Sequence, residues 1–139
     1  MDADLIRQCA VDSLLPAIVE QFIATAGARS PFDIVITIDG RRLDIPPPPS
    51  EDEALRIVRH FVSAGGDVRV GLTRFPAHLA AEDPSGIDMA VIDPCLNVRI
   101  GTALFARIYE RERARDNSSD ADAFARAAAI YFSEHPLKE

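Results

Sequence analysis

Residues 92–115, IDPCLNVRIGTALFARIYERERAR, constrain the fold most, because they predict one long helix with a defined start. Asp93 is a typical N-cap residue, and Pro94 fits the first helical position, where its missing N–H is not needed. Gly101 is less favourable than Ala inside a helix by about 1 kcal/mol, so we expect another backbone segment to approach it closely. Helical spacing predicts a buried face made of Leu96, Ile100, Ala103, Leu104 and Ile108.

The sequence IVITIDGRRLDI, residues 34–45, is the strongest β signal in the chain. Isoleucine occupies every second position of its first half, as expected for a strand, and Asp39-Gly40 supplies the positive φ angles of a two-residue hairpin turn. The prolines at 46–49 cannot donate to a sheet, so we expect them to form a stiff extended spacer after the hairpin.

Helices are predicted on both sides of this hairpin. Residues 3–26 predict one broken helix or two short ones, with Ser13 as a cap of the second segment and Gly27 at its end. After the prolines, Ser50 and Glu53 form a capping box that begins an amphipathic helix.

The remaining segments complete the expected order of elements. Residues 67–76, DVRVGLTRFP, alternate apolar and polar positions and predict one strand ending at Pro76. Residues 77–92 are expected to be mostly loop. Ser119 opens a last helix that we expect to stop at Pro136, followed by a short flexible tail from about residue 136.

Composition bounds the class of protein. With 139 residues, the chain is long enough for one domain with its own core, over residues 1–139. A net charge of -7 argues against nucleic acid or anionic lipid as partners, since these require clustered Lys and Arg. We expect no membrane span, no cofactor and no metal site. Cys9 and Cys95 could form one bridge, stay reduced in the core, or do neither.

Seven features occur in the order in which a known group of enzymes carries its motifs: Cys9, LLPAIVEQFIATAG, the Asp39-Gly40 turn, PPPPSEDEA, VRVGLTRFP, DPCLNVRIGTAL and ARAAAIYF. The chain thereby resembles, over nearly its whole length, the lytic transglycosylases of type IV secretion and conjugation systems, members of the goose-lysozyme-like superfamily. Within that group, LIRQCA, RVGLTRFPA and NVRIGTALFA most resemble the TraH conjugal-transfer family of rhizobia and agrobacteria. The resemblance implies an α+β, mainly helical, lysozyme-like single domain with a small antiparallel hairpin or sheet.

The catalytic residue of these enzymes is missing from the matched segment. They use one Glu as acid and then base, at the end of the helix that corresponds to LLPAIVEQFIATAG. Alignment from the left places this Glu near Phe22, and alignment from the right places it between Ala26 and Ala28, yet residues 21–30 contain no carboxylate. Glu20 is the nearest acid, but it lies roughly 200° around the helix from Phe22, so a solvated surface position is the better interpretation.

Other matched positions have also changed. The family's glutamine and asparagine in its G-L-x-Q-I-N segment correspond to Arg74 and Pro76, and the asparagine of its Y-N pair to Phe132. The candidates for lining the former groove are Thr73, Arg74, Phe75 and Tyr131. A core position is favoured for Tyr131, and an exposed arginine at a strand end is as common as one that binds a ligand.

Three functional hypotheses follow. The leading one is a non-catalytic accessory protein of a conjugal-transfer or type IV secretion system, which binds a peptidoglycan glycan strand or a protein of the machinery. The alternatives are an active peptidoglycan lytic transglycosylase using Glu20, and a cytoplasmic interaction domain. The absence of a signal peptide favours the cytoplasm, whereas the family analogy implies the periplasm and, there, a disulfide between Cys9 and Cys95.

Overall fold

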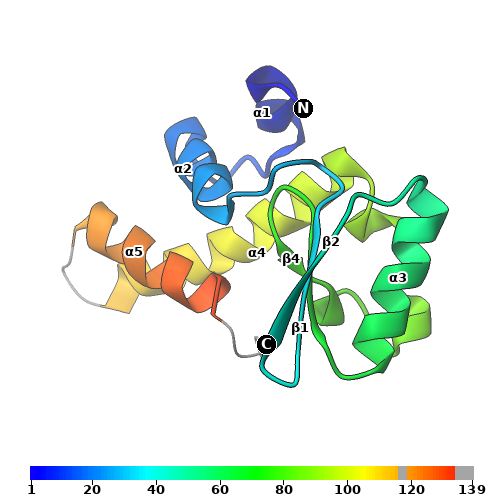
Figure 1. Cartoon of the computed structure of the whole chain (residues 1–139). Helices are drawn as coiled ribbons and strands as arrows, with labels where there is room; N and C mark the ends of the chain where they lie inside the picture. Colours follow the sequence, from blue (N-terminus) through cyan, green and yellow to red (C-terminus); the bar gives the residue numbers. More distant parts are fainter. Residues whose placement is uncertain (116–118, 134–139) are drawn as a thin grey trace.

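The computed structural model of the protein describes residues 1–115 and 119–133 (Figure 1). These residues form an α+β, mainly helical fold, which confirms the expected class; the lysozyme-like architecture stays a prediction. The helices are α1 (Ala3–Cys9), α2 (Pro16–Ala26), α3 (Glu51–Ser63), α4 (Pro94–Arg115) and α5 (Asp120–Tyr131). The strands are β1 (Ile34–Ile38), β2 (Arg41–Ile45), β3 (Asp67–Val70) and β4 (Phe75–Pro76). Short 3-10 helices are η1 (Ala77–Leu79), η2 (Pro84–Gly86) and η3 (Met89–Val91).

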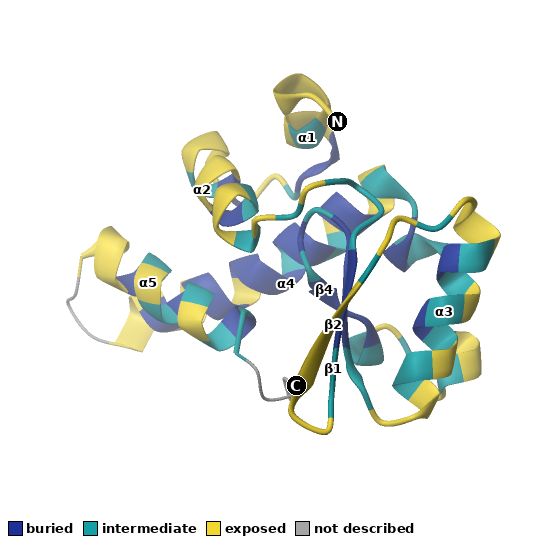
Figure 2. Ribbon diagram, in the orientation of Figure 1, coloured by how far each residue is buried: buried dark blue, intermediate teal, exposed yellow. Residues whose placement is uncertain are grey.

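The hairpin forms where the sequence predicts it. Asp39 and Gly40 have φ angles of 52° and 74°, as a two-residue turn requires, and Ile38 pairs with Arg41 next to it. β1 also pairs with β3, so the antiparallel sheet has the order β2-β1-β3-β4. The edge strand β2 is exposed (Figure 2).

The two faces of the sheet differ in character, because paired residues in adjacent strands share a face. One face carries buried apolar side chains that belong to the core, including Ile34, Ile36, Val68 and Val70. The opposite face carries two cross-strand rows, Arg42-Thr37-Asp67 and Asp44-Val35-Arg69. The sheet therefore contributes to the core with one face and presents charged side chains on the other.

The strand predicted for residues 67–76 is interrupted, which corrects the expectation. Gly71 and Arg74 have φ angles of 78° and 51°, so the chain turns back at 71–74 and Phe75 pairs antiparallel with Val70. A side chain at Gly71 would be strained, since an ideal Cβ there would lie 2.6 Å from the Asn97 side chain. The close approach of Asn97 thus explains the glycine.

The side chain of Asn97 holds this turn on α4. Its Nδ2 donates to the carbonyl oxygens of Val70 and Val91, both at 2.9 Å. Its Oδ1 accepts from the backbone N–H of Thr73 at 3.3 Å and from the Thr73 hydroxyl at 2.9 Å. Gly101, one turn further along α4, leaves room for the Thr73 side chain, whose Oγ1 lies 2.2 Å from an ideal Cβ at that position. The close neighbour of Gly101 is a side chain, where a backbone segment was expected.

The start of α4 is confirmed, but its predicted buried face is partly wrong. Asp93 Oδ1 accepts from the N–H groups of Cys95 and Leu96 at 3.1 and 3.2 Å. Leu96 is 46% exposed, although Leu104 and Ile108 are buried as expected. The helix is covered on several sides, by α1, α5 and η3. Its buried positions therefore include small and polar residues that an apolar pattern does not reveal: Asn97, Gly101, Thr102 and Glu112.

The N-terminal region forms the two short helices that were one of the alternatives. Ser13 does not cap the second one; α2 begins after Leu15 without a side-chain cap, and Pro16 takes its first position. Gly27 ends α2 with a φ angle of 68°. Cys9 and Cys95 form a disulfide with their Cα atoms 5.2 Å apart, which joins α1 to the start of α4.

An aromatic cluster fills the core between α2, α4 and α5. The ring of Phe22 stacks on Phe105 at a centroid distance of 4.4 Å and meets Tyr131 edge-on at 4.9 Å. All three rings are fully buried. At the C-terminal end, α5 ends at Tyr131, whereas the predicted stop at Pro136 and the tail from about residue 136 lie outside the described residues.

Over the described ranges, no helix combines the length and the apolar character needed to cross a membrane.

Replacing Asn97 by Asp should lower the free energy of unfolding by about 3 kcal/mol, because a carboxylate cannot donate to the Val70 and Val91 carbonyls and would be buried against them. Gln21→Glu makes the same chemical change at an exposed site on α2 and should cost less than about 0.5 kcal/mol. Urea denaturation of the three proteins measures both values. Equal losses in the two variants would contradict the bridging role of Asn97.

Reduction of the Cys9–Cys95 disulfide should lower the free energy of unfolding by about 3–4 kcal/mol, because the two residues are 86 positions apart and the unfolded chain regains that loop's freedom. Denaturation with and without dithiothreitol measures the change. The double variant Cys9→Ala/Cys95→Ala is the control and should not respond to the reductant. Identical denaturation midpoints for oxidised and reduced wild-type protein would show that the disulfide does not stabilise the fold.

Candidate functional site

A pocket of about 310 Å³ lies on the charged face of the sheet, where the C-terminal ends of α2 and α5 meet the strands. We call it the cationic pocket. Its lining residues are Thr25, Ala26, Val35, Thr37, Gly40, Arg42, Asp67, Arg69, Arg74, Phe132 and Ser133. The end of α2 is also the region in which the resemblance to lytic transglycosylases places the catalytic Glu, so this pocket is the candidate site.

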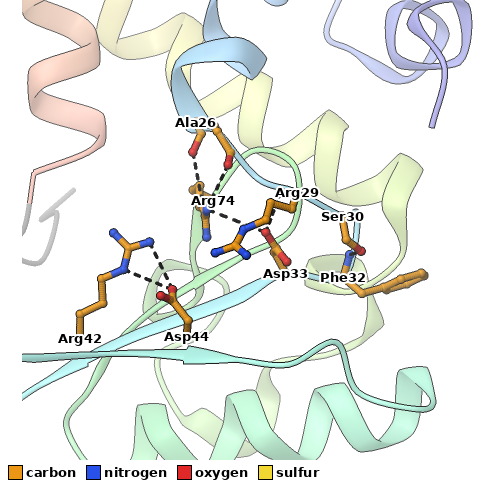
Figure 3. A network of polar contacts seen from close by, with 9 residues as sticks. Ala26, Arg29, Ser30, Phe32, Asp33, Arg42, Asp44 and Arg74 are labelled. Carbon is orange, nitrogen blue, oxygen red and sulfur yellow. Dashed lines mark hydrogen bonds and ion pairs between the residues drawn. The ribbon is translucent and has the colours of Figure 1, made fainter.

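Arg74 reaches from the turn at 71–74 to the end of α2 (Figure 3). Its Nε donates to the Ala26 carbonyl at 3.1 Å and its Nη2 to the Gly27 carbonyl at 3.4 Å. Its Nη2 also lies 3.9 Å from Asp33 Oδ2. These contacts stabilise the C-terminal end of a helix, where backbone carbonyls lack partners within the helix.

One nitrogen of the same guanidinium has no such partner. Among the described residues, Nη1 of Arg74 is buried and forms no hydrogen bond. Burial lowers the pKa of Arg74 below its ordinary value, and the negative charge of Asp33 acts in the opposite direction. Arg74 remains cationic, since arginine is protonated at any physiological pH. The charge at this point of the pocket is therefore only partly compensated.

Arg69 supplies a second positive charge, but its hydrogen-bonding capacity is used within the protein. Its Nε donates to Asp67 Oδ1 at 3.0 Å, its Nη1 to the Tyr131 carbonyl at 2.7 Å and its Nη2 to the Ser133 carbonyl at 2.9 Å. The side chain thereby fixes the end of α5 over the charged face of the sheet. Its role in the pocket is that of a fixed charge.

Arg42 differs from the other two arginines because its side chain is 61% exposed. It donates to Asp44, its neighbour on the same face of β2, at 3.2 Å (Figure 3). Ion pairs this exposed contribute little to stability, so Arg42 can exchange partners at low cost. The lining of the pocket has three arginines and one aspartate, Asp67, in a chain of net charge -7. Asp44 and Asp33 lie next to Arg42 and Arg74 outside that lining.

Arg74 also borders a second hollow, of about 300 Å³, between the hairpin and the 29–33 segment. There Asp33 Oδ2 accepts from the backbone N–H of Arg29 at 2.7 Å, and Asp44 lines the opposite wall. Two arginines and two aspartates line this hollow. Arginines thus outnumber aspartates in the lining of the cationic pocket but not in the lining of this hollow.

The groove residues predicted from the sequence do not line one common pocket. Arg74 lines the cationic pocket, whereas Thr73 and Tyr131 are fully buried beneath it. The Tyr131 hydroxyl donates to the Thr73 carbonyl at 2.8 Å, and burial raises the pKa of this phenol. Phe75 lies elsewhere, in the wall of an apolar hollow of about 760 Å³. That hollow is lined by Val11, Ser13, Phe75, Leu79, Ile100, Ala103, Leu104, Ala106, Arg107 and Glu110.

No carboxylate occupies the predicted position of the acid. Phe22, one of the two aligned positions, is enclosed by aromatic rings, and the other, residues 26–28, has two of its carbonyls bound by Arg74. Glu20 is 59% exposed and lies 3.5 Å from Arg7 on the outer side of α2. Glu112 is buried at 3% exposure, but it pairs with Arg115 and Arg126 between α4 and α5 and does not line the pocket.

Sequence reasoning missed Arg42, Asp67 and Arg69 as pocket residues. A signal for Arg42 existed: a two-residue turn at Asp39-Gly40 fixes the hairpin register and so places Arg42 opposite Thr37. The pairing of β1 with β3 has no such local signal. Within the described part of the chain, no group of three or more His, Cys, Asp or Glu side chains could hold a metal ion.

Arg74→Lys should keep the charge but lose the contacts with the α2 carbonyls, because lysine lacks the planar fork of donors. We expect the free energy of unfolding to fall by about 1–2 kcal/mol, with faster amide hydrogen exchange in the last turn of α2. Arg29→Lys, at an exposed position, is the matched control and should leave both unchanged. Unaltered exchange at the end of α2 in Arg74→Lys would show that the guanidinium does not hold this helix.

Comparison with known proteins gives a family for the chain. It matches the TraH_2 family over residues 1–127. It is 42% identical over 108 residues to the uncharacterized protein y4dP of Sinorhizobium fredii (strain NBRC 101917 / NGR234), an alignment that covers 78% of this chain and 54% of y4dP. The chain thus spans about half the length of this relative. No solved structure matches it. The chain belongs to the TraH_2 family, and this membership suggests a conjugal-transfer-related protein.

Proposed function

We propose that this protein is a non-catalytic, transglycosylase-like accessory protein of a conjugal-transfer or type IV secretion system, and that it binds peptidoglycan at the cationic pocket. The observation that carries the proposal is the chemistry at the end of α2. Where the resemblance places a proton-donating Glu, the chain has an arginine bound to the carbonyls of Ala26 and Gly27.

The electrostatics of the pocket argue against glycoside cleavage. Cleavage requires a carboxylic acid that holds a proton near the glycosidic oxygen, and its transition state carries positive charge on the sugar ring. Of the carboxylates nearest the end of α2, Asp67 is paired with Arg69, and Asp33 lies beside Arg74. Three arginines around the pocket would repel a developing positive charge. The same charges favour holding an anionic ligand.

The disulfide between Cys9 and Cys95 supports a location in the periplasm, where this function would be exercised. Disulfides persist in oxidising compartments such as the bacterial periplasm, where peptidoglycan is accessible, and are rare in the cytoplasm.

A protein component of the secretion machinery is a second candidate ligand, favoured by a different surface. Leu96, Ile100 and Ala103 follow one another at helical spacing on α4, and the last two line the apolar hollow of about 760 Å³. Contiguous apolar surface of this kind is typical of sites that contact another protein. This surface would serve binding to the machinery, and the cationic pocket would serve binding to the cell wall.

Purified protein should sediment with insoluble peptidoglycan without clearing its turbidity, because Asp67, the carboxylate that lines the pocket, is paired with Arg69 and does not serve as a proton donor. Glu20→Gln should behave like the wild type in both assays, since Glu20 faces solvent. A hen-type lysozyme serves as the positive control for clearing. Clearing that is lost in Glu20→Gln would establish the enzyme hypothesis instead, and protein that stays in the supernatant would reject binding to peptidoglycan.

A further inference from the structure

We infer that the cationic pocket is a carboxylate-binding site, in which Arg42 and Arg74 hold the anion and Arg69 adds a fixed positive charge. The pocket recognises the carboxylate group itself. That this carboxylate belongs to peptidoglycan rests on the proposed function.

Arg74 lines the pocket with a charge that is only partly compensated. Two of its nitrogens are bound to carbonyls of α2, while Nη1 is buried without a partner among the described residues. Asp33 is 3.9 Å from Nη2 and is bound at 2.7 Å to the backbone of Arg29. An anion in the pocket would place a negative charge beside this guanidinium and so offset its positive charge.

Arg42 is available to a ligand. It is exposed, and its ion pair is with its neighbour Asp44, which does not line the pocket. Thr37 lies directly opposite Arg42 across the strands and lines the same wall. A ligand between β2 and the 71–74 turn would therefore meet the exposed guanidinium of Arg42 and the fixed guanidinium of Arg74. Guanidinium groups bind carboxylates through charge-assisted and often bidentate hydrogen bonds.

The wall of the pocket also restricts the group attached to the anion. Between the charged positions, the wall includes the apolar side chains of Ala26, Val35 and Phe132, next to the hydroxyl residues Thr25, Thr37 and Ser133. A volume of about 310 Å³ is at the lower limit for a small-molecule site and does not accommodate a glycan strand. The pocket thus fits the end of a ligand: a carboxylate on a carbon with a small apolar substituent, as in a terminal alanine.

The test uses N-acetylalanine as the probe and N-acetylalaninamide as its uncharged counterpart. Each is titrated into the full chain labelled with nitrogen-15, and the arginine Nε signals are followed by NMR. We expect the acid to shift the signals of Arg42 and Arg74, the amide to leave them unchanged, and the binding to weaken as salt is added. Shifts of equal size with the amide, or no shift with either compound, would overturn the inference.

Two variants of adjacent residues form a matched pair. Arg42 lines the pocket, whereas Arg41 lies next to it on β2 with its side chain on the opposite face, so Arg42→Gln and Arg41→Gln remove the same charge at exposed positions. Arg42→Gln should weaken binding of N-acetylalanine about tenfold, and Arg41→Gln by less than about twofold. Equal effects of the two variants would reduce the site to general electrostatic attraction and contradict the proposal.

Sedimentation with peptidoglycan separates this inference from the proposed function. If N-acetylalanine binds but the protein does not sediment, the carboxylate site stands and its source lies outside peptidoglycan. If the protein sediments equally well as wild type and as Arg42→Gln, and N-acetylalanine does not compete, peptidoglycan binding stands and the carboxylate site is wrong.

Discussion

The side-chain amide of Asn97 connects parts of the chain that are far apart in sequence. From the first turn of α4 it binds the end of β3, Thr73 in the 71–74 turn and the end of η3 through four hydrogen bonds. An amide is suited to this position because it donates and accepts at once, and both capacities are used. Buried polar groups that are fully satisfied in this way specify one arrangement of the elements around them.

The position of the pocket follows from this contact. Since the 71–74 turn is held on α4, Arg74 is directed towards the end of α2 and binds its last carbonyls. Arg69, on the strand just before the turn, binds the carbonyls at the end of α5 in the same manner. Two arginines from one short segment thus bind the backbone carbonyls at two helix C-termini. The positive charge of the pocket arises from groups that also hold the fold together.

The sequence predicted those elements that are defined by local chemistry. The Asp39-Gly40 turn and the Asp93-Pro94 helix start were found because each depends on residues adjacent in the chain. The same holds for the capping box, in which Ser50 accepts from the N–H of Glu53 at 3.1 Å. In these cases the conformational preference and the tertiary structure agree.

Where contacts between distant parts of the chain decide the conformation, the pattern of apolar and polar residues did not predict it. The alternation of residues 67–76 is that of a strand, yet the approach of Asn97 converts 71–74 into a turn. Leu96 fits an apolar stripe but faces outward, because the buried stripe of α4 is built partly from small and polar residues. Arg74 was among the predicted site residues, but the residues that line the pocket with it could not be named from the sequence. They come from α2, β2 and β3, whose arrangement depends on packing.

The charged edge strand β2 has a consequence for how copies of this chain meet. Its outer side pairs with no other strand in the described part of the chain, and such an edge invites pairing with another molecule. Here four of its five residues are exposed, Arg41 and Arg42 stand at its start, and the prolines 46–49 follow its end. Repulsion between like charges and the lack of N–H donors in the prolines disfavour sheet extension from one molecule to the next. The hairpin can therefore border an accessible pocket without becoming a seed for aggregation.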